Sequence, residues 1–145
     1  MENSKNIREW RAEEISKLFL LKTDYKFNIE DYPTPLFDFF VTLKDKPEVR
    51  FAVEVKTQNS FNPKIKKQLE SIKIYRDSGM INIPVFIFKI DQEKEIGEFD
   101  FLVLPSFNED KLLVRFDFNF IELNNENFSK KMNTIIKWFN KENKP

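Results

Sequence analysis

The chain has 145 residues, of which 41% are hydrophobic, and its formal net charge is zero. This length fits one domain, residues 1–145, that is large enough to bury roughly two thirds of its unfolded surface. Cysteine and histidine are absent and only two glycines occur, which excludes disulfides, thiolate and imidazole metal sites, and glycine-rich phosphate or dinucleotide loops.

Two further absences concern the cellular location. No apolar run reaches the roughly 18 residues that a membrane span needs, and the N-terminal residues lack the basic and then apolar pattern of an export signal. We therefore expect a cytoplasmic protein with no membrane partner, whose catalysis, if any, uses carboxylates, lysines or hydroxyl groups.

The first expected element is a helix from about Ser4 to Lys22. Glu14 falls in the middle of its apolar face, and Glu13 is rotated about 100° away, toward the side or solvent. The helical period therefore favours Glu14 as an inward-pointing acid, although Glu13 stays open as the alternative. The apolar face is formed by residues at spacings of three, four and seven: Ile7, Trp10, Leu18 and Leu21.

A short strand is expected at Tyr25–Ile29, and a proline-containing loop leads from it into a hairpin. Two apolar runs flank the polar turn 44–47, as in an antiparallel pair. If the turn is centred on Lys46, the numbers of paired residues sum to 92, and Asp38 lies opposite Glu54. Because side chains alternate along a strand, Glu54 and Lys56 share a face. The hairpin thus gathers two carboxylates and one ammonium group.

The second half of the chain predicts further strands and helices. Pro63 suits the first turn of a helix that ends near Gly79, and the apolar run 83–90 is typical of a strand covered on both faces. Strands are also expected at 99–104 and 112–123, and a closing helix at 126–141. We therefore predict an α/β protein of the α+β kind, with a mixed central sheet flanked by helices.

Charge is unevenly distributed along the chain. Segment 56–76 carries six basic residues against one acid, whereas segment 91–110 carries seven acids against one lysine. Lysines next to the hairpin could attract the phosphates of a nucleic acid, although such residues also form ordinary solvated helix faces. The candidate nucleic-acid contacts are Lys64, Lys66, Lys67, Lys73 and Gln68.

Two opposed carboxylates repel each other and are costly to desolvate, so the hairpin requires a compensating cation. Mg²⁺ or Mn²⁺ meets this need, because these ions prefer oxygen ligands such as Asp38, Glu54 and the Val55 carbonyl. Lys56 beside the ion can hold or deprotonate an attacking water, a combination that suits phosphodiester hydrolysis. In the alternative interpretation, the two acids lie at strand ends in solvent and pair with Lys56 and Arg50.

The order of a helix with an acid, a strand with Asp and a strand with Glu-x-Lys resembles the core of the PD-(D/E)XK restriction-endonuclease-like nucleases. The match consists of the segment from Pro35 to Asp38 and the triplet Glu54-Val55-Lys56, with Glu14 in the place of the first-helix acid. The proline lies three residues before Asp38 rather than next to it. This resemblance implies a restriction-endonuclease-like core, acidic metal ligands at Glu14, Asp38 and Glu54, and Lys56 as the catalytic lysine.

On this basis we expect a Mg²⁺- or Mn²⁺-dependent endonuclease that hydrolyses DNA, in bacterial defence or DNA processing. A domain of this size covers little duplex, so a homodimer or a partner subunit is expected. The alternative is a non-catalytic protein of the same fold that binds nucleic acid or another protein. Zero net charge and the acidic second half favour that alternative.

Overall fold

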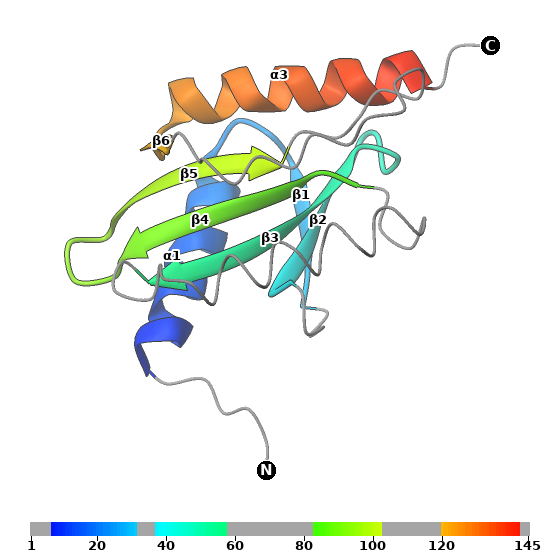
Figure 1. Ribbon diagram of the computed structural model, residues 1–145. Coiled ribbons are helices and arrows are strands. Elements are labelled where there is room, and N and C mark those ends of the chain that lie inside the picture. Colours follow the sequence, from blue (N-terminus) through cyan, green and yellow to red (C-terminus); the bar gives the residue numbers. More distant parts are fainter. Residues whose placement is uncertain (1–6, 32–36, 58–82, 103–119, 143–145) are drawn as a thin grey trace.

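The computed structural model describes residues 7–31, 37–57, 83–102 and 120–142. At 101–102 and 141–142 it describes the backbone only. Two helices flank a six-stranded mixed sheet (Figure 1). The elements are α1 (Ile7–Lys22), β1 (Phe27–Glu30), β2 (Phe39–Leu43), β3 (Arg50–Thr57), β4 (Val85–Asp91), β5 (Ile96–Leu102), β6 (Ile121–Glu122) and α3 (Asn125–Glu142). The predicted mixed sheet with flanking helices is therefore present.

The strands follow one another across the sheet in the order of the chain. Every neighbouring pair is antiparallel except β3 and β4, which run parallel. A parallel pair requires a crossover, and the segment between these strands contains the predicted basic helix. That helix, with all five candidate nucleic-acid contacts, lies outside the described residues. So does most of the strand predicted at 112–123, of which β6 is the described part.

The register of the β2–β3 hairpin agrees with the sequence prediction. Phe39 pairs with Val53 and Thr42 pairs with Arg50, so paired numbers sum to 92. The turn closes with two main-chain hydrogen bonds, from the N–H of Leu43 to the Val49 carbonyl and from the N–H of Val49 to the Lys46 carbonyl. The prediction of a turn centred on Lys46 is confirmed.

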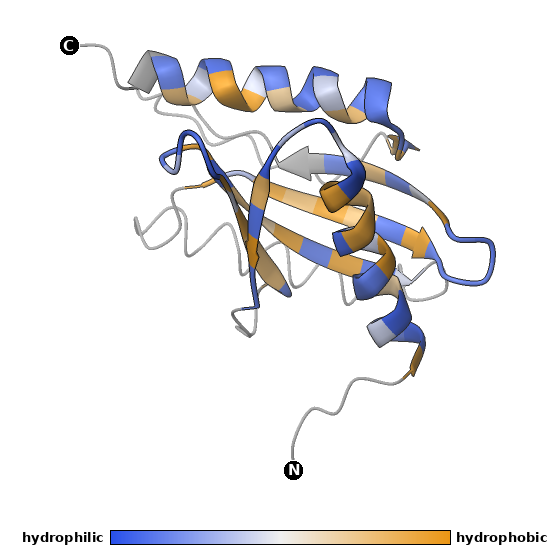
Figure 2. Cartoon of the chain, turned by 180° about the vertical axis from the view of Figure 1, so that it is seen from behind, coloured by the Kyte–Doolittle hydropathy of each residue, from blue (hydrophilic) through white to orange (hydrophobic). Residues whose placement is uncertain are grey.

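The main hydrophobic cluster lies on one face of the sheet, and Phe128 of α3 is at its centre. Its ring lies 5.5 Å from that of Phe19 in α1, so both helices contribute to this core. Figure 2 shows α1 in front of the sheet and α3 along its upper edge. Six further aromatic rings lie between 5.5 and 6.5 Å from Phe128, namely Tyr25, Phe27, Phe51, Phe86, Phe88 and Phe99. Aromatic pairs at these separations add to the stabilisation that comes from apolar burial.

Helix α1 packs through a different face from the predicted one. Its buried residues are Ala12, Glu13, Ser16 and Leu20, whereas the predicted apolar face of Ile7, Trp10, Leu18 and Leu21 is exposed. The small side chains of Ala12 and Ser16 allow the helix to approach the sheet closely, and the Ser16 hydroxyl donates a 2.8 Å hydrogen bond to the Ala12 carbonyl. Because apolar residues occupy both sides of this helix, their spacing could not identify the packed side.

No helix in the described part of the chain is both long enough and apolar enough to cross a bilayer.

Candidate active site

The two neighbours of strand β3 pair with different parts of it. It pairs with β2 up to Val53, whereas its pairing with β4 continues to Thr57. Among the described residues, no strand lies beside the second half of β3 on the β2 side. An unpaired strand edge presents main-chain N–H and C=O groups that need other partners.

Asp38 supplies one of these partners. Its main-chain N–H donates a 2.9 Å hydrogen bond to the Val53 carbonyl, although Val53 is already opposite Phe39 in the ladder. Two residues thus face one, which is the arrangement of a β-bulge and turns the Asp38 side chain along β3. There its carboxylate accepts a 2.7 Å hydrogen bond from the main-chain N–H of Val55.

The same strand geometry directs the Val55 carbonyl. In a strand, the N–H and C=O groups of one residue point to the same side. Because the Val55 N–H points toward Asp38, its carbonyl oxygen also points to the side where β2 has ended. A main-chain oxygen and a carboxylate therefore lie at the same open edge.

A cavity of about 140 Å³ lies at this edge. Its lining combines residues from α1, from the bulge before β2 and from the second half of β3: Glu9, Glu13, Asp38, Glu54, Val55, Lys56 and Thr57. Of the predicted site residues, Asp38, Glu54, Val55 and Lys56 are brought together here. Glu9, Glu13 and Thr57 join them.

Glu54 is an acid in a protected position. It is 5% exposed, and its Oε1 atom lies 4.0 Å from the Nζ atom of Lys56, which shares its face of the sheet. A carboxylate withdrawn from water in this way must gain compensation from a cation or from hydrogen bonds. The interpretation of Glu54 as a solvated strand-end residue is therefore wrong.

The helix acid at the cavity is Glu13, which is 8% exposed. Glu14 lies on the outer side of α1 with its side chain 75% exposed, 3.9 Å from the Nζ atom of Lys17. The expectation that Glu14 points inward and Glu13 outward is thus wrong, because the sheet packs against the other side of the helix. Glu9 lies one helical turn before Glu13 and so shares its side of the helix. This spacing of four residues between two acids could be read from the sequence.

The oxygen atoms at the edge are of the type that Mg²⁺ and Mn²⁺ prefer. Among the described residues there is no group of three or more acids placed to hold a metal ion. An ion at this edge would be held by the carboxylates of Asp38 and Glu54 and by the Val55 carbonyl, with water as its remaining ligands, and Glu13 lines the same cavity.

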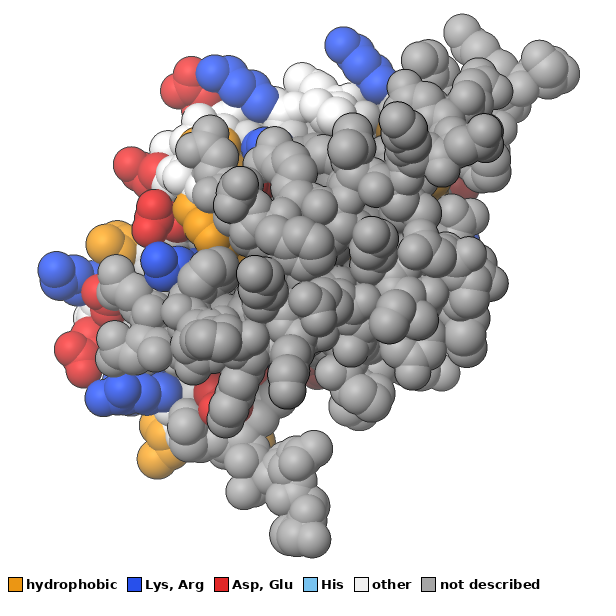
Figure 3. Space-filling view, viewed as in Figure 1, with side chains coloured by type: hydrophobic (Ala, Val, Ile, Leu, Met, Phe, Trp, Pro, Cys, Tyr) orange, Lys and Arg blue, Asp and Glu red, His pale blue; other side chains and the backbone are white. Residues whose placement is uncertain are grey.

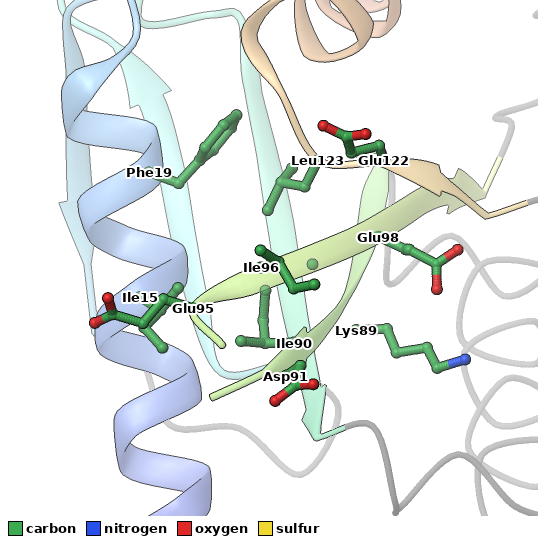
Figure 4. Close-up of a pocket in the computed structure, with 11 residues that line it drawn as sticks. Ile15, Phe19, Lys89, Ile90, Asp91, Glu95, Ile96, Glu98, Glu122 and Leu123 are labelled. Carbon is green, nitrogen blue, oxygen red and sulfur yellow. The ribbon is translucent and has the colours of Figure 1, made fainter. Parts of the chain in front are cut away.

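A larger hollow, of about 520 Å³, lies between α1 and the β4–β5 turn (Figure 4). Its apolar lining comes from Ile15, Phe19, Ile90, Ile96 and Leu123. Four acids and one lysine complete it: Asp91, Glu95, Glu98, Glu122 and Lys89. The cavity at β3 has the same balance of four acids and one lysine, so charge does not distinguish the two; the smaller cavity differs in that Asp38, Glu54 and Lys56 line it together.

The charges of the described surface are mixed. In the view of Figure 3, acidic and basic side chains are intermixed over the coloured part of the molecule. Comparison with known proteins adds no assignment, since no family model, curated protein or solved structure matches the chain.

Proposed function

We propose that this chain is a metal-dependent nuclease that hydrolyses phosphodiester bonds of DNA, and that its core is of the PD-(D/E)XK restriction-endonuclease-like type. The observation that carries the proposal is that Asp38, Glu54, Val55 and Lys56 line one cavity at an open strand edge. The order of α1, the β2–β3 hairpin and a parallel β4 also supports a core of this type.

Each residue has a part in the proposed reaction. Asp38, Glu54 and the Val55 carbonyl hold the divalent ion, which when bound supplies Lewis acidity and neutralises negative charge at the phosphate. Lys56 holds the attacking water by a hydrogen bond. The water oxygen forms a bond to phosphorus as the water loses a proton to solvent, the bond from phosphorus to the leaving oxygen breaks, and the leaving oxygen takes up a proton from solvent. Glu13 replaces Glu14 as the acid contributed by the first helix.

The test is a nicking assay on supercoiled plasmid and linear DNA with Mg²⁺ or Mn²⁺. The wild-type protein should cut, and Asp38→Asn and Lys56→Met should lose at least about 100-fold in rate, the usual order for removing a group that acts in the transition state. Glu48→Gln, an exposed acid in the hairpin turn, is the matched control and should cut like the wild type. Equal cleavage by all four proteins would contradict the site assignment.

The second candidate function is a non-catalytic module of the same fold that binds nucleic acid or protein. It is favoured by the lack, over the described residues, of a group of three acids placed to hold a metal. Calorimetric titration with Mn²⁺ separates the two functions. Heat that disappears in Asp38→Asn and Glu54→Gln supports the nuclease, whereas no binding at millimolar Mn²⁺ supports the module.

A further inference from the structure

Two hollows adjoin along α1 and together form an open groove. The first, of about 520 Å³, is the one between α1 and the β4–β5 turn. The second, of about 570 Å³, lies between α1 and the end of β1, and it shares Ile15 and Glu95 with the first. Its lining residues on α1 extend from Arg11 to Leu21, about 15 Å along the helix axis. The groove is therefore elongated, as a site for a segment of polypeptide is.

Much of the lining of this groove is apolar, and part of it is open to solvent. Ile96 lines the first hollow and Leu18 and Leu21 line the second, and these side chains are between 51% and 59% exposed. They are three of the five exposed large hydrophobic side chains among the described residues. Exposed apolar surface that gathers in one place marks a binding surface. Figure 4 shows apolar side chains from α1 and from the strands on both sides of the first hollow, namely Ile15, Phe19, Ile90, Ile96 and Leu123.

The charges of the first hollow are unbalanced. Glu98 is the register partner of Lys89 across β4 and β5, so these two opposite charges are neighbours. The other three acids at the hollow are Asp91, Glu95 and Glu122. Within the described ranges, no lysine or arginine lies within 4.0 Å of any of these three carboxylates. The first hollow therefore combines apolar surface with uncompensated negative charge.

In the second hollow the charges are already matched. The Nζ atom of Lys17 lies 2.6 Å from Asp31 and 3.9 Å from Glu14, and Arg11 adds a second cation to these two acids. The uncompensated acids are thus confined to the first hollow, and Glu95, which lines both hollows, lies where the two meet. A segment bound along the groove would meet apolar surface throughout and negative charge at one end.

We propose that this groove binds a segment of a partner protein that carries large apolar side chains next to lysine or arginine. The apolar side chains contact Ile15 and Ile96, and a basic side chain approaches Glu95. Charge complementarity selects this occupant, because a cation from the partner supplies the compensation that the three acids lack within this chain. The groove shares no lining residue with the cavity at β3, and the inference does not depend on the proposed function.

The test uses three short peptides as probes. The first alternates lysine and leucine, the second glutamate and leucine, and the third lysine and serine. The lysine–leucine peptide should bind at least about ten times more tightly than either of the others, because it alone supplies both apolar surface and positive charge. No binding of this peptide at millimolar concentration, or equal binding of either control peptide, would overturn the proposal.

The main chain at Gly97 gives a readout at the groove itself. The chain contains only two glycines, so few signals share the glycine region of its amide nuclear magnetic resonance spectrum. Gly97 lines the first hollow, and its signal should move as the lysine–leucine peptide is added. Binding that leaves this signal in place would put the peptide elsewhere. A signal that moves on dilution of the protein alone would assign the groove to a second copy, and either result overturns the proposal.

Variants with matched controls separate the groove from the rest of the surface. Glu95→Lys should weaken binding of the lysine–leucine peptide about tenfold, whereas Glu48→Lys, the same change at an exposed acid of the hairpin turn, should have no effect. Ile96→Ser should weaken binding by a similar factor, whereas Ile7→Ser, at another exposed isoleucine, should have no effect. All four positions are exposed, so each variant should keep the wild-type circular dichroism spectrum. Wild-type affinity in Glu95→Lys and Ile96→Ser would overturn the proposal.

Discussion

The carboxylate of Asp38 accepts a 2.7 Å hydrogen bond from the main-chain N–H of Val55, and so takes the place of a strand partner where β2 has ended. One side chain thereby completes the fold locally and also lines the candidate site. Stability and the proposed activity are therefore linked at this residue, and a suitable pair of variants can separate them.

Asp38→Ala should lower the free energy of unfolding by about 1–2 kcal/mol, because the Val55 N–H loses this acceptor. Asp38→Asn keeps an acceptor oxygen and should lose less than half as much. Under the proposed function both variants are inactive, so activity would follow the charge and stability would follow the hydrogen bond. Urea denaturation measures the difference, and an alanine variant as stable as the wild type would contradict it.

Glu13→Gln and Glu14→Gln form a matched pair, because the two residues are adjacent in α1 and each substitution removes one negative charge. Glu13 lines the cavity and Glu14 does not. We expect Glu13→Gln to weaken Mn²⁺ binding about tenfold, the usual effect of losing a group that supports metal ligands, and Glu14→Gln to bind as the wild type does. Titration calorimetry at low micromolar protein gives both constants. The reverse order would restore the assignment made from helical spacing.

Gly97→Ala should destabilise the protein by about 1–3 kcal/mol, the cost of adding an atom to a packed core. A Cβ atom at Gly97 would lie 2.6 Å from the Cδ1 atom of Ile90 and 3.1 Å from the Lys89 carbonyl oxygen. Ile90→Val removes the closer of these atoms. The double variant should therefore be more stable than the sum of the two single effects implies, and thermal unfolding of all four proteins measures this coupling. Strict additivity would show that the side chain of Ile90 is not the obstacle.

Lys131→Met should destabilise the protein by about 1–3 kcal/mol, because it leaves a buried carboxylate with less compensation. Asp100 is fully buried in β5, and its Oδ1 atom lies 3.4 Å from the Nζ atom of Lys131 in α3. Adding Asp100→Asn removes the uncompensated charge and should recover part of the loss. Chemical denaturation at two salt concentrations measures the loss of stability in Lys131→Met and its partial recovery in the double variant. If the double variant loses the full sum of the single effects, the pair is not coupled.

The hairpin could be predicted from the sequence because its register depends on residues that are close together in the chain. A polar turn between two apolar runs fixes the register, and the register fixes that Glu54 and Lys56 share a face and that Asp38 is near them. The sequence could not show that β2 begins only at Phe39, because the bulge depends on how the preceding chain enters the sheet. The hydrogen bond from Val55 to Asp38 was therefore found only in the structure.

The packed side of α1 was predicted wrongly because it depends on the contact with the sheet and not on the local sequence. Spacings of three, four and seven residues put Ile7, Trp10, Leu18 and Leu21 on one side of the helix, and this side was predicted to face the core. The sheet instead packs against Ala12 and Ser16, where small side chains let the helix come close. The spacing of apolar residues shows that a helix has an apolar side, but not which of two such sides meets the sheet.

The half-paired state of β3 also has a spectroscopic consequence. The Val55 amide proton is shared with a carboxylate of the candidate site rather than with another strand. Its nuclear magnetic resonance frequency should respond when that carboxylate gains a proton, a cation or a substrate nearby, because hydrogen bonds to charged groups are the strong ones. A single backbone signal can thus report events at the cavity without any label attached to it.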